Sequence, residues 1–205
     1  MIKSLILVVI VFLFFVGYMK YKKRPELNAS EQAALNFVDV VSDNNTDVNL
    51  SLTLFLMDKN AYFKKYEDDL EERGIESPEE ITLPVAIIDA LLNAERLVYA
   101  DHSTESDFVL SSIDKLSNGK ISQSRCYDHL MTAYKAAGRL NGISGVLYDS
   151  NISPMPFECI NSQGFKLLAI DEGSDSYAFI LLPTEDVETA MKYADLAGLQ
   201  LMFTD

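Results

Sequence analysis

The chain has 205 residues, a formal net charge of −14, two cysteines and no tryptophan. The charge is unevenly distributed: the first 24 residues hold five of the 17 basic residues and no acid, so the remainder has a formal charge of −19. An acidic domain repels phosphate groups, which argues against binding nucleic acid or anionic lipid through this part of the chain. Such a charge suits solubility or a basic protein partner, and the remaining residues are enough for one domain with a core.

The uncharged apolar stretch from Leu5 to Met19 predicts a membrane-spanning helix. It is shorter than the roughly 20 residues that a span needs, but flanking lysines extend it by snorkelling to the interfaces, so we expect residues 2–22 to form one spanning helix. A cleaved signal peptide is the alternative, and the missing small-residue cleavage site argues against it. The positions taken to represent the span are Leu5, Val9, Leu13 and Val16.

Basic residues flank this segment unequally: Lys20, Lys22, Lys23 and Arg24 follow it, and only Lys3 precedes it. The positive-inside bias therefore places the C-terminal domain in the cytoplasm, anchored to the inner (cytoplasmic) membrane with the lipid bilayer as partner of the helix. We expect a transmembrane anchor with its basic flank at 1–24, a tether at 25–29 and an acidic domain at 30–205.

Cys126 and Cys159 are expected to be reduced and half-buried in a cytoplasmic domain, whereas the opposite orientation would allow a disulfide. Cys126 and His129 also share one helical face, but a zinc site needs about four ligands, so no metal site is assigned to them.

The first half of the domain is predicted to be helical. A capping box at Asn28–Glu31 opens a helix that reaches Val41. Residues 48–57 fit both a strand and a helix, and a helix is favoured because no Gly or Pro separates them from a helix over 61–73. That later helix is expected to stop at Gly74, a residue suited to a left-handed cap.

The middle of the chain mixes helices with one short strand. Ser77–Glu80 has the pattern of a helix start, with Pro at the first position and acids in the first turn. A second capping box is predicted at Thr104–Asp107. Further predictions are helices over 85–94, 104–116 and 122–137, a strand over 97–100, a short strand over 145–148 and a helical turn over 157–162.

The last forty residues predict a β-β-α-β arrangement. Two strands over 165–170 and 177–182 flank a turn at 171–174, and a helix ending at Ala197 leads to a final strand over 199–203. The fold class is therefore α+β, with an N-terminal transmembrane helix followed by a single helical domain that carries a small sheet.

The segment from 165 to 200, FKLLAIDEGSDSYAFILLPTEDVETAMKYADLAGLQ, resembles the C-terminal signature of an uncharacterised bacterial domain family. That signature is a strand, Asp-x-Gly-Ser-Asp-Ser-Tyr, a strand, Pro, a helix and a closing strand. Residues 62–116 resemble the first half of the same family, although His102 stands where the family tends to have Trp. The resemblance covers most of residues 60–203 and implies a fold, with no established catalysis or cofactor.

The hairpin turn holds the densest group of candidate functional side chains. A calcium loop would need oxygen ligands over about 12 residues, which this turn does not supply. Turn chemistry accounts for part of the motif, since Asp171 and Ser174 can bond local amides and Gly173 can take positive φ. Because the motif exceeds what a turn requires, we predict a binding rim made of Asp171, Gly173, Ser174, Asp175, Ser176 and Tyr177, with Asp101 and His102 beside it.

Two functions remain open. The favoured one is a membrane-anchored, non-enzymatic protein-interaction module, immunity-like or adaptor-like, with a basic protein as its partner and no cofactor. The alternative is a metal-dependent or hydrolytic enzyme that uses Asp101, His102, Asp171 and Asp175. No residue is assigned as catalytic, because no phosphate loop, nucleophile elbow or HExxH motif is present.

Overall fold

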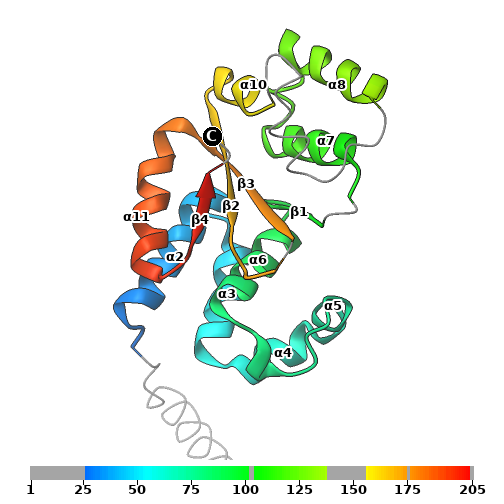
Figure 1. The fold of residues 1–205 in the computed structure, drawn as a ribbon. Coiled ribbons are helices and arrows are strands. Elements are labelled where there is room, and N and C mark those ends of the chain that lie inside the picture. Colours follow the sequence, from blue (N-terminus) through cyan, green and yellow to red (C-terminus); the bar gives the residue numbers. More distant parts are fainter. Residues whose placement is uncertain (1–25, 102–103, 138–155, 175, 204–205) are drawn as a thin grey trace, which may run out of the picture.

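The computed structural model describes residues 26–101, 104–137, 156–174 and 176–203 (Figure 1). The predicted membrane anchor and the predicted strand over 145–148 lie outside these residues. Within the described ranges, no helix combines the length and the apolar character that crossing a bilayer requires. The elements in chain order are α2 (Ala29–Ser42), α3 (Thr46–Met57), α4 (Lys59–Lys65), α5 (Glu67–Glu72), η1 (Pro78–Glu80), α6 (Leu83–Asn93), β1 (Val98–Ala100), α7 (Ser106–Leu116), α8 (Arg125–Ala137), α10 (Pro156–Ser162), β2 (Phe165–Ile170), β3 (Tyr177–Pro183), η2 (Thr184–Asp186), α11 (Val187–Ala197) and β4 (Leu201–Phe203).

The four described strands form one antiparallel sheet in the order β1-β3-β2-β4. The hairpin of β2 and β3 occupies its centre, so the predicted β-β-α-β ending is confirmed and β1 is added beside β3. In the register of these strands Ala100 lies opposite Tyr177, and Leu168 lies opposite both Ile180 and Phe203. The fold class, α+β with a small sheet backed by helices, is confirmed for the described residues.

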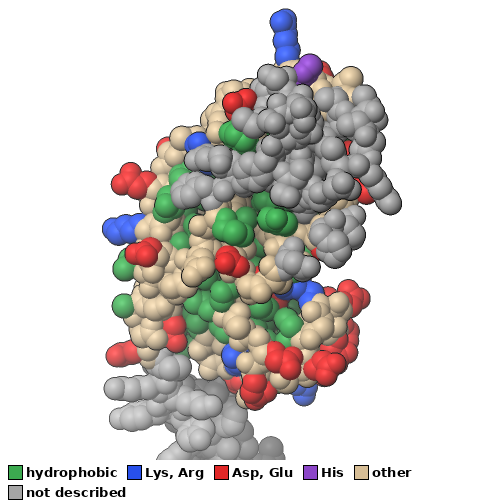
Figure 2. Space-filling view, in the orientation of Figure 1, with side chains coloured by type: hydrophobic (Ala, Val, Ile, Leu, Met, Phe, Trp, Pro, Cys, Tyr) green, Lys and Arg blue, Asp and Glu red, His purple; other side chains and the backbone are tan. Residues whose placement is uncertain are grey.

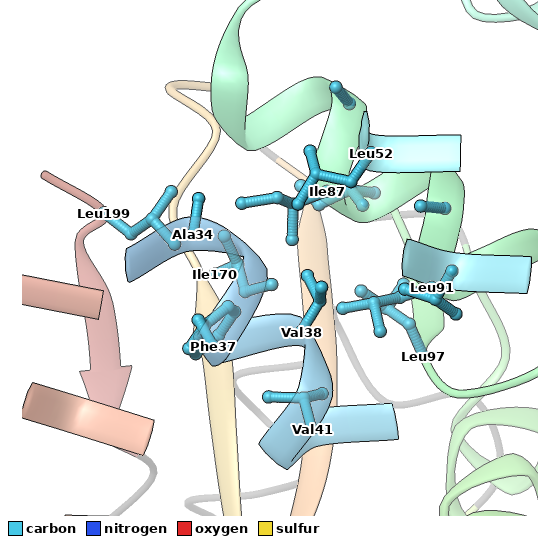
Figure 3. Packing of buried hydrophobic residues seen from close by; sticks show 14 of the residues in the cluster. Ala34, Phe37, Val38, Val41, Leu52, Ile87, Leu91, Leu97, Ile170 and Leu199 are labelled. Atoms are coloured by element: carbon cyan, nitrogen blue, oxygen red, sulfur yellow. The ribbon is translucent and has the colours of Figure 1, made fainter. Parts of the chain in front are cut away.

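Alternate residues of each strand point to opposite faces, and each face is covered by its own group of helices. One group consists of α2, α3, α6 and α11, which pack with short α4 and α5 on Leu168, Ile170 and Ile180; we call this the first core cluster (Figure 3). The other group, α7, α8 and α10, packs on Leu167 and Phe179 and forms the second core cluster. Figure 1 shows these last three helices gathered at one end of the molecule.

Local capping explains several helix ends. The predicted box at the start of α2 is present: the Asn28 side chain accepts from the Glu31 amide at 2.9 Å, and the Asn28 amide donates to Glu31 Oε2 at 2.7 Å. The ambiguous residues 48–57 form α3, whose first turn is capped by the Asn45 side chain. α11 ends at Gly198, which has a φ of 75° and takes the left-handed conformation that favours glycine.

The single helix predicted over 61–73 is wrong. The structure has two short helices, α4 and α5, which meet at Tyr66 with φ −117° and ψ 22°. The Tyr66 ring packs against that of Tyr62, with centroids 4.8 Å apart. Three acids, Glu67, Asp68 and Asp69, then lie in the first turn of α5, where the positive end of a helix dipole favours negative charge.

The capping box predicted at Thr104–Asp107 is also wrong. α7 begins at Ser106, and its N-cap Glu105 makes no side-chain capping hydrogen bond. Thr104 instead turns back to Asp101: its hydroxyl accepts from the Asp101 amide at 3.0 Å and donates to Asp101 Oδ1 at 3.1 Å. These contacts shape the connection that leaves β1, so the threonine stabilises a turn rather than the helix.

Candidate functional site

A buried group of charged side chains fastens the hairpin turn to the helices. Arg73, the C-cap residue of α5, donates to Asp89 Oδ1 on α6 and to Glu172 Oε2 in the turn, the latter at 2.7 Å. The Tyr99 hydroxyl of β1 donates to Glu172 Oε1. The Glu172 side chain is 4% exposed and that of Asp89 is 9% exposed. We call these four residues the Arg73 network.

The network holds two carboxylates against one guanidinium, a formal charge of −1. The Arg73 guanidinium also lies 5.0 Å from the centroid of the Tyr99 ring, a favourable placement for a cation beside an aromatic face. Glu172 accepts a third hydrogen bond from the Ser174 hydroxyl at 3.0 Å. Asp89 Oδ2 is buried with no hydrogen-bond partner among the described atoms. Both carboxylates therefore depend on Arg73 for charge compensation.

The turn itself shows the expected local chemistry. Asp171 Oδ1 accepts from the Gly173 amide at 2.8 Å, and the Ser174 hydroxyl accepts from the Ser176 amide at 3.1 Å. Gly173 has a φ of 82°, the left-handed conformation predicted for it. Gly173 and Ser174 are exposed, whereas Asp171 and Ser176 are half-buried. Asp175 lies outside the described residues, so its place in the rim stays a prediction.

Tyr177 has a packing contact that the sequence did not indicate. Its ring stacks on that of Phe179, with centroids 5.5 Å apart and an interplanar angle of 4°. Tyr177 is half-buried and packs against the second core cluster. The predicted recognition ring therefore also contributes to the core.

The sheet brings Asp101 to the same end as the turn, because the strand pair β1–β3 places Ala100 opposite Tyr177. The Asp101 carboxylate accepts from Thr104, as described above. His102 lies outside the described residues. No group of three or more His, Cys, Asp or Glu side chains that could hold a metal ion occurs within the described ranges.

None of the four network residues was part of the predicted binding rim, although Glu172 lies between its members Asp171 and Gly173. The sequence carried weak signals for two of them. Asp89 is the one charged residue of α6, whose other residues are mostly apolar. Arg73 is the one basic residue between positions 67 and 80. Neither signal names a partner, because Arg73 and Glu172 are 99 positions apart.

An acidic surface adjoins the network. We call residues 67–80 the acidic segment, because all eight of its carboxylates are on exposed residues. Figure 2 shows red side chains gathered at the lower right, which is where Figure 1 places α4 and α5. A small depression of about 200 Å³ opens at its start, lined by Lys64, Lys65, Tyr66, Glu67, Asp68 and Asp69. The eight acids are Glu67, Asp68, Asp69, Glu71, Glu72, Glu76, Glu79 and Glu80.

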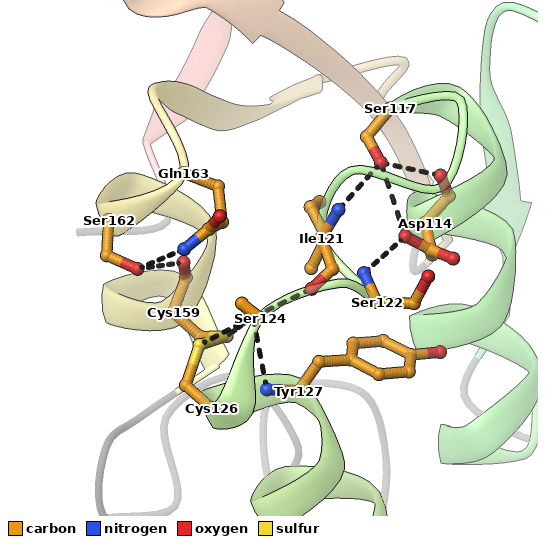
Figure 4. The surroundings of a disulfide bond; sticks show 10 residues. All are labelled: Asp114, Ser117, Ile121, Ser122, Ser124, Cys126, Tyr127, Cys159, Ser162 and Gln163. Carbon is orange, nitrogen blue, oxygen red and sulfur yellow. Dashed lines mark hydrogen bonds between the residues drawn. A yellow bond between two sulfur atoms is a disulfide. The ribbon is translucent and has the colours of Figure 1, made fainter.

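The prediction of two reduced cysteines is wrong in this structure: Cys126 and Cys159 form a disulfide, with Cα atoms 5.7 Å apart (Figure 4). Packing of α8 beside α10 brings the two residues together across 33 positions of sequence, which composition alone could not reveal. His129, one turn further along α8, is exposed. The pairing thus uses both cysteines and leaves no thiol for a metal site.

Comparison with protein families matches residues 33–130 and 157–204 to a family described as a domain of unknown function, DUF6630. The chain belongs to this family. All four residues of the Arg73 network lie within the matched ranges, and so do both cysteines. Membership of DUF6630 confirms the resemblance to an uncharacterised domain family, while the hairpin signature and a bacterial source stay predictions. Comparisons with curated proteins and with solved structures found no match.

Proposed function

We propose that the chain is a membrane-anchored, non-enzymatic interaction module that binds a basic protein through the hairpin turn and the acidic segment. The observation that carries this proposal is the 2.7 Å contact of Arg73 with Glu172, which joins two surfaces far apart in the sequence. Arg73 belongs to the acidic segment, and Glu172 belongs to the turn. Their contact holds the two segments together, which lets their exposed residues serve one partner.

Charge supports a basic partner. The guanidinium of Arg73 points inward to Asp89 and Glu172, so it does little to offset the exposed carboxylates of its own segment. A surface with an uncompensated negative potential accelerates encounters with positively charged partners and disfavours acidic ones. An immunity-like or adaptor-like role is one form that such capture would take.

Rigidity supports the turn as a recognition feature. Glu172 is held by three side chains, and Asp171 and Ser174 bond amides of the turn itself. A surface loop fixed in this way loses little conformational entropy on binding, so more of the contact energy appears as affinity. The exposed positions of the turn, Gly173 and Ser174, would meet the partner first.

The membrane part of the proposal rests on the sequence. The apolar segment before Lys20 anchors the chain, and its basic flank places the domain on the cytoplasmic side of the inner membrane. Anionic headgroups would attract Lys20–Arg24 and repel the acidic domain. The domain surface would then stay available to a protein partner.

The test is binding of a fluorescent lysine-rich peptide to the full chain in detergent micelles. Glu71→Gln with Glu72→Gln removes two exposed charges of the acidic segment, and we expect binding to weaken by roughly 2- to 10-fold at low salt. Glu185→Gln with Glu188→Gln removes the same charge from exposed residues around the start of α11 and is the matched control. Equal weakening by both pairs would contradict a localised surface.

A variant of the hairpin turn tests its part of the surface in the same peptide-binding assay. Asp175→Ala should change the free energy of unfolding by less than about 1 kcal/mol, as expected for a side chain that serves binding rather than the core, and still weaken peptide binding. A loss of several kcal/mol would instead make Asp175 a structural residue and remove it from the proposed surface.

A further inference from the structure

The disulfide joins two helices of the second core cluster. Cys126 is the second residue of α8, and Cys159 lies in the middle of α10. Among the α8 side chains that the structure describes, Leu130 is fully buried in the cluster, while Cys126, Tyr127 and Met131 pack against it. Among the described side chains of α8, the cross-link therefore adds a covalent attachment to the contacts of Leu130, Tyr127 and Met131.

The two sulfur atoms differ in access. Cys126 is half-buried at the edge of the cluster, whereas Cys159 is 1% exposed. A thiolate from another molecule attacks the sulfur that it can reach, and the other sulfur leaves. Access therefore makes Cys126 the attacked sulfur and Cys159 the leaving group.

One hydroxyl lies against both sulfurs. Ser124 Oγ is 3.1 Å from Cys126 Sγ and 3.6 Å from Cys159 Sγ (Figure 4). It also donates to the Ile121 carbonyl at 2.7 Å and accepts from the Tyr127 amide at 3.3 Å. After reduction the same oxygen can accept from a thiol or donate to a thiolate, so the reduced cysteines would not lack a polar partner.

We propose that Cys126 and Cys159 form a reversible thiol–disulfide exchange site, and that its redox state sets how firmly α8 is attached. This inference rests on the cytoplasmic placement within the proposed function. Disulfides in reducing compartments are usually transient, whereas a secreted domain keeps them permanently. A reducing cytoplasm therefore favours an exchange site over a permanent structural bond.

A dithiol protein is the reductant that opens the bond, and the disulfide of a small thiol is the oxidant that re-forms it. A thiolate of the reductant attacks Cys126 Sγ, the bond to Cys159 breaks, and its electron pair leaves on Cys159 Sγ, which takes up a proton. The second thiol of the reductant then attacks the reductant sulfur that is bonded to Cys126 in the mixed disulfide, and this releases Cys126 as a thiol. The reductant ends as a disulfide. To re-form the cross-link, the Cys126 thiolate attacks the small disulfide and releases one small thiol, and the Cys159 thiolate then attacks Cys126 Sγ and releases the second.

The first experiment traps the thiols of the full chain in living cells by acid quenching and alkylation with a high-mass maleimide. We expect two free thiols in untreated cells, an intramolecular cross-link after treatment with diamide, and free thiols again after the oxidant is removed. Cys126→Ser and Cys159→Ser should each leave one thiol and never form this cross-link. A bond that persists without oxidant, or one that never forms, would overturn the proposal.

The second experiment compares amide hydrogen exchange of the purified full chain with the bond intact and reduced. Amides of α8 should exchange at least about tenfold faster after reduction, because the closed loop no longer restrains the helix, and those of α2 should not change. Equal α8 rates in the two states would overturn the proposed control of attachment.

A reporter fused after Asp205, active only outside the cytoplasm, separates the two ways of failing. If the reporter is silent and the cysteines never pair, the exchange site is overturned and the cytoplasmic placement stands. An active reporter with a permanent bond would overturn both the exchange site and the cytoplasmic placement within the proposed function.

Discussion

The two faces of the sheet are stabilised in different ways. On the first face, α2, α3, α6 and α11 bury large apolar side chains such as Phe37, Leu52 and Leu91 with no exposure. On the second face, the described parts of helices α7, α8 and α10 cover the sheet, and a disulfide joins α8 to α10. Noncovalent contacts hold the first face, while the second adds a cross-link whose presence depends on redox conditions.

Helix α2 shows why packing suffices on the first face. It lies beside α11, where the small side chains Ala190 and Ala194 are buried and let the two helices approach closely (Figure 1). The Ser30 hydroxyl donates to the Ala197 carbonyl at 3.2 Å and ties the two helix ends together. Neither α2 nor α11 holds a cysteine, so no thiol contributes to this contact.

The largest effect is expected from a direct test of this contrast. Phe37→Ala should reduce the free energy of unfolding by about 3–5 kcal/mol, because a fully buried ring leaves a cavity between α2 and the sheet. Leu130→Ala on the second face should cost less, about 2–3 kcal/mol, because losing part of a leucine side chain leaves a smaller cavity than losing a phenyl ring. Urea denaturation of the full chain measures both. A larger loss at Leu130 would contradict the proposed division of stability.

A smaller loss is expected from breaking the link between the first face and the hairpin turn. Arg73→Met should reduce the free energy of unfolding by about 3 kcal/mol, since Asp89 and Glu172 would be left buried without compensation. Arg96→Met removes the same charge from a half-buried arginine outside the network and is the control. Faster hydrogen exchange at residues 171–176 in the Arg73 variant alone would show that the network holds the turn.

Adding Asp89→Asn and Glu172→Gln to Arg73→Met tests the electrostatic explanation. Both changes remove the charges that Arg73 compensates, so the triple variant should recover part of the loss seen in Arg73→Met. A triple variant less stable than Arg73→Met would mean that packing of the Arg73 side chain, rather than charge, accounts for the effect.

The smallest expected effect is a change of stability with pH, which we expect from Tyr62 of α4 on the first face. Burial raises the pKa of the Tyr62 hydroxyl above its ordinary value of 10.0. Above pH 10 the unfolded chain loses this proton while the folded chain retains it, so stability falls as pH rises, by at most about 1.4 kcal/mol per pH unit. Below pH 10 the Tyr62 hydroxyl keeps its proton in both the folded and the unfolded chain, so it causes no loss of stability there.

Tyr62→Phe should flatten this alkaline loss in urea titrations between pH 10 and 11. It should change neutral-pH stability little, because the buried hydroxyl has no hydrogen-bond partner among the described residues. Phe55→Leu alters the ring that packs on Tyr62 without removing a titrating group, so its pH dependence should match that of the unchanged chain. An unchanged slope in Tyr62→Phe would show that another group causes the loss.

Much of the fold could be predicted because its signals are local. The capping box at Asn28, the left-handed glycine at Gly198 and the alternating strands around the turn at 171–174 each depend on residues a few positions apart. Such contacts form in almost any surroundings, so the sequence by itself determined α2, α11 and the β2–β3 hairpin. It also determined the division between a basic N-terminal flank and an acidic domain.

Tertiary structure alone decided the features that depend on distant partners. Thr104 had two local alternatives, since a hydroxyl can cap a helix or turn back to Asp101, and the local sequence did not indicate that the second is formed. Arg73 meets Glu172, and Cys126 meets Cys159, because the sheet and its covering helices bring them together. A charge or a thiol in the sequence carries no information on which distant side chain will reach it, since that depends on how whole helices pack.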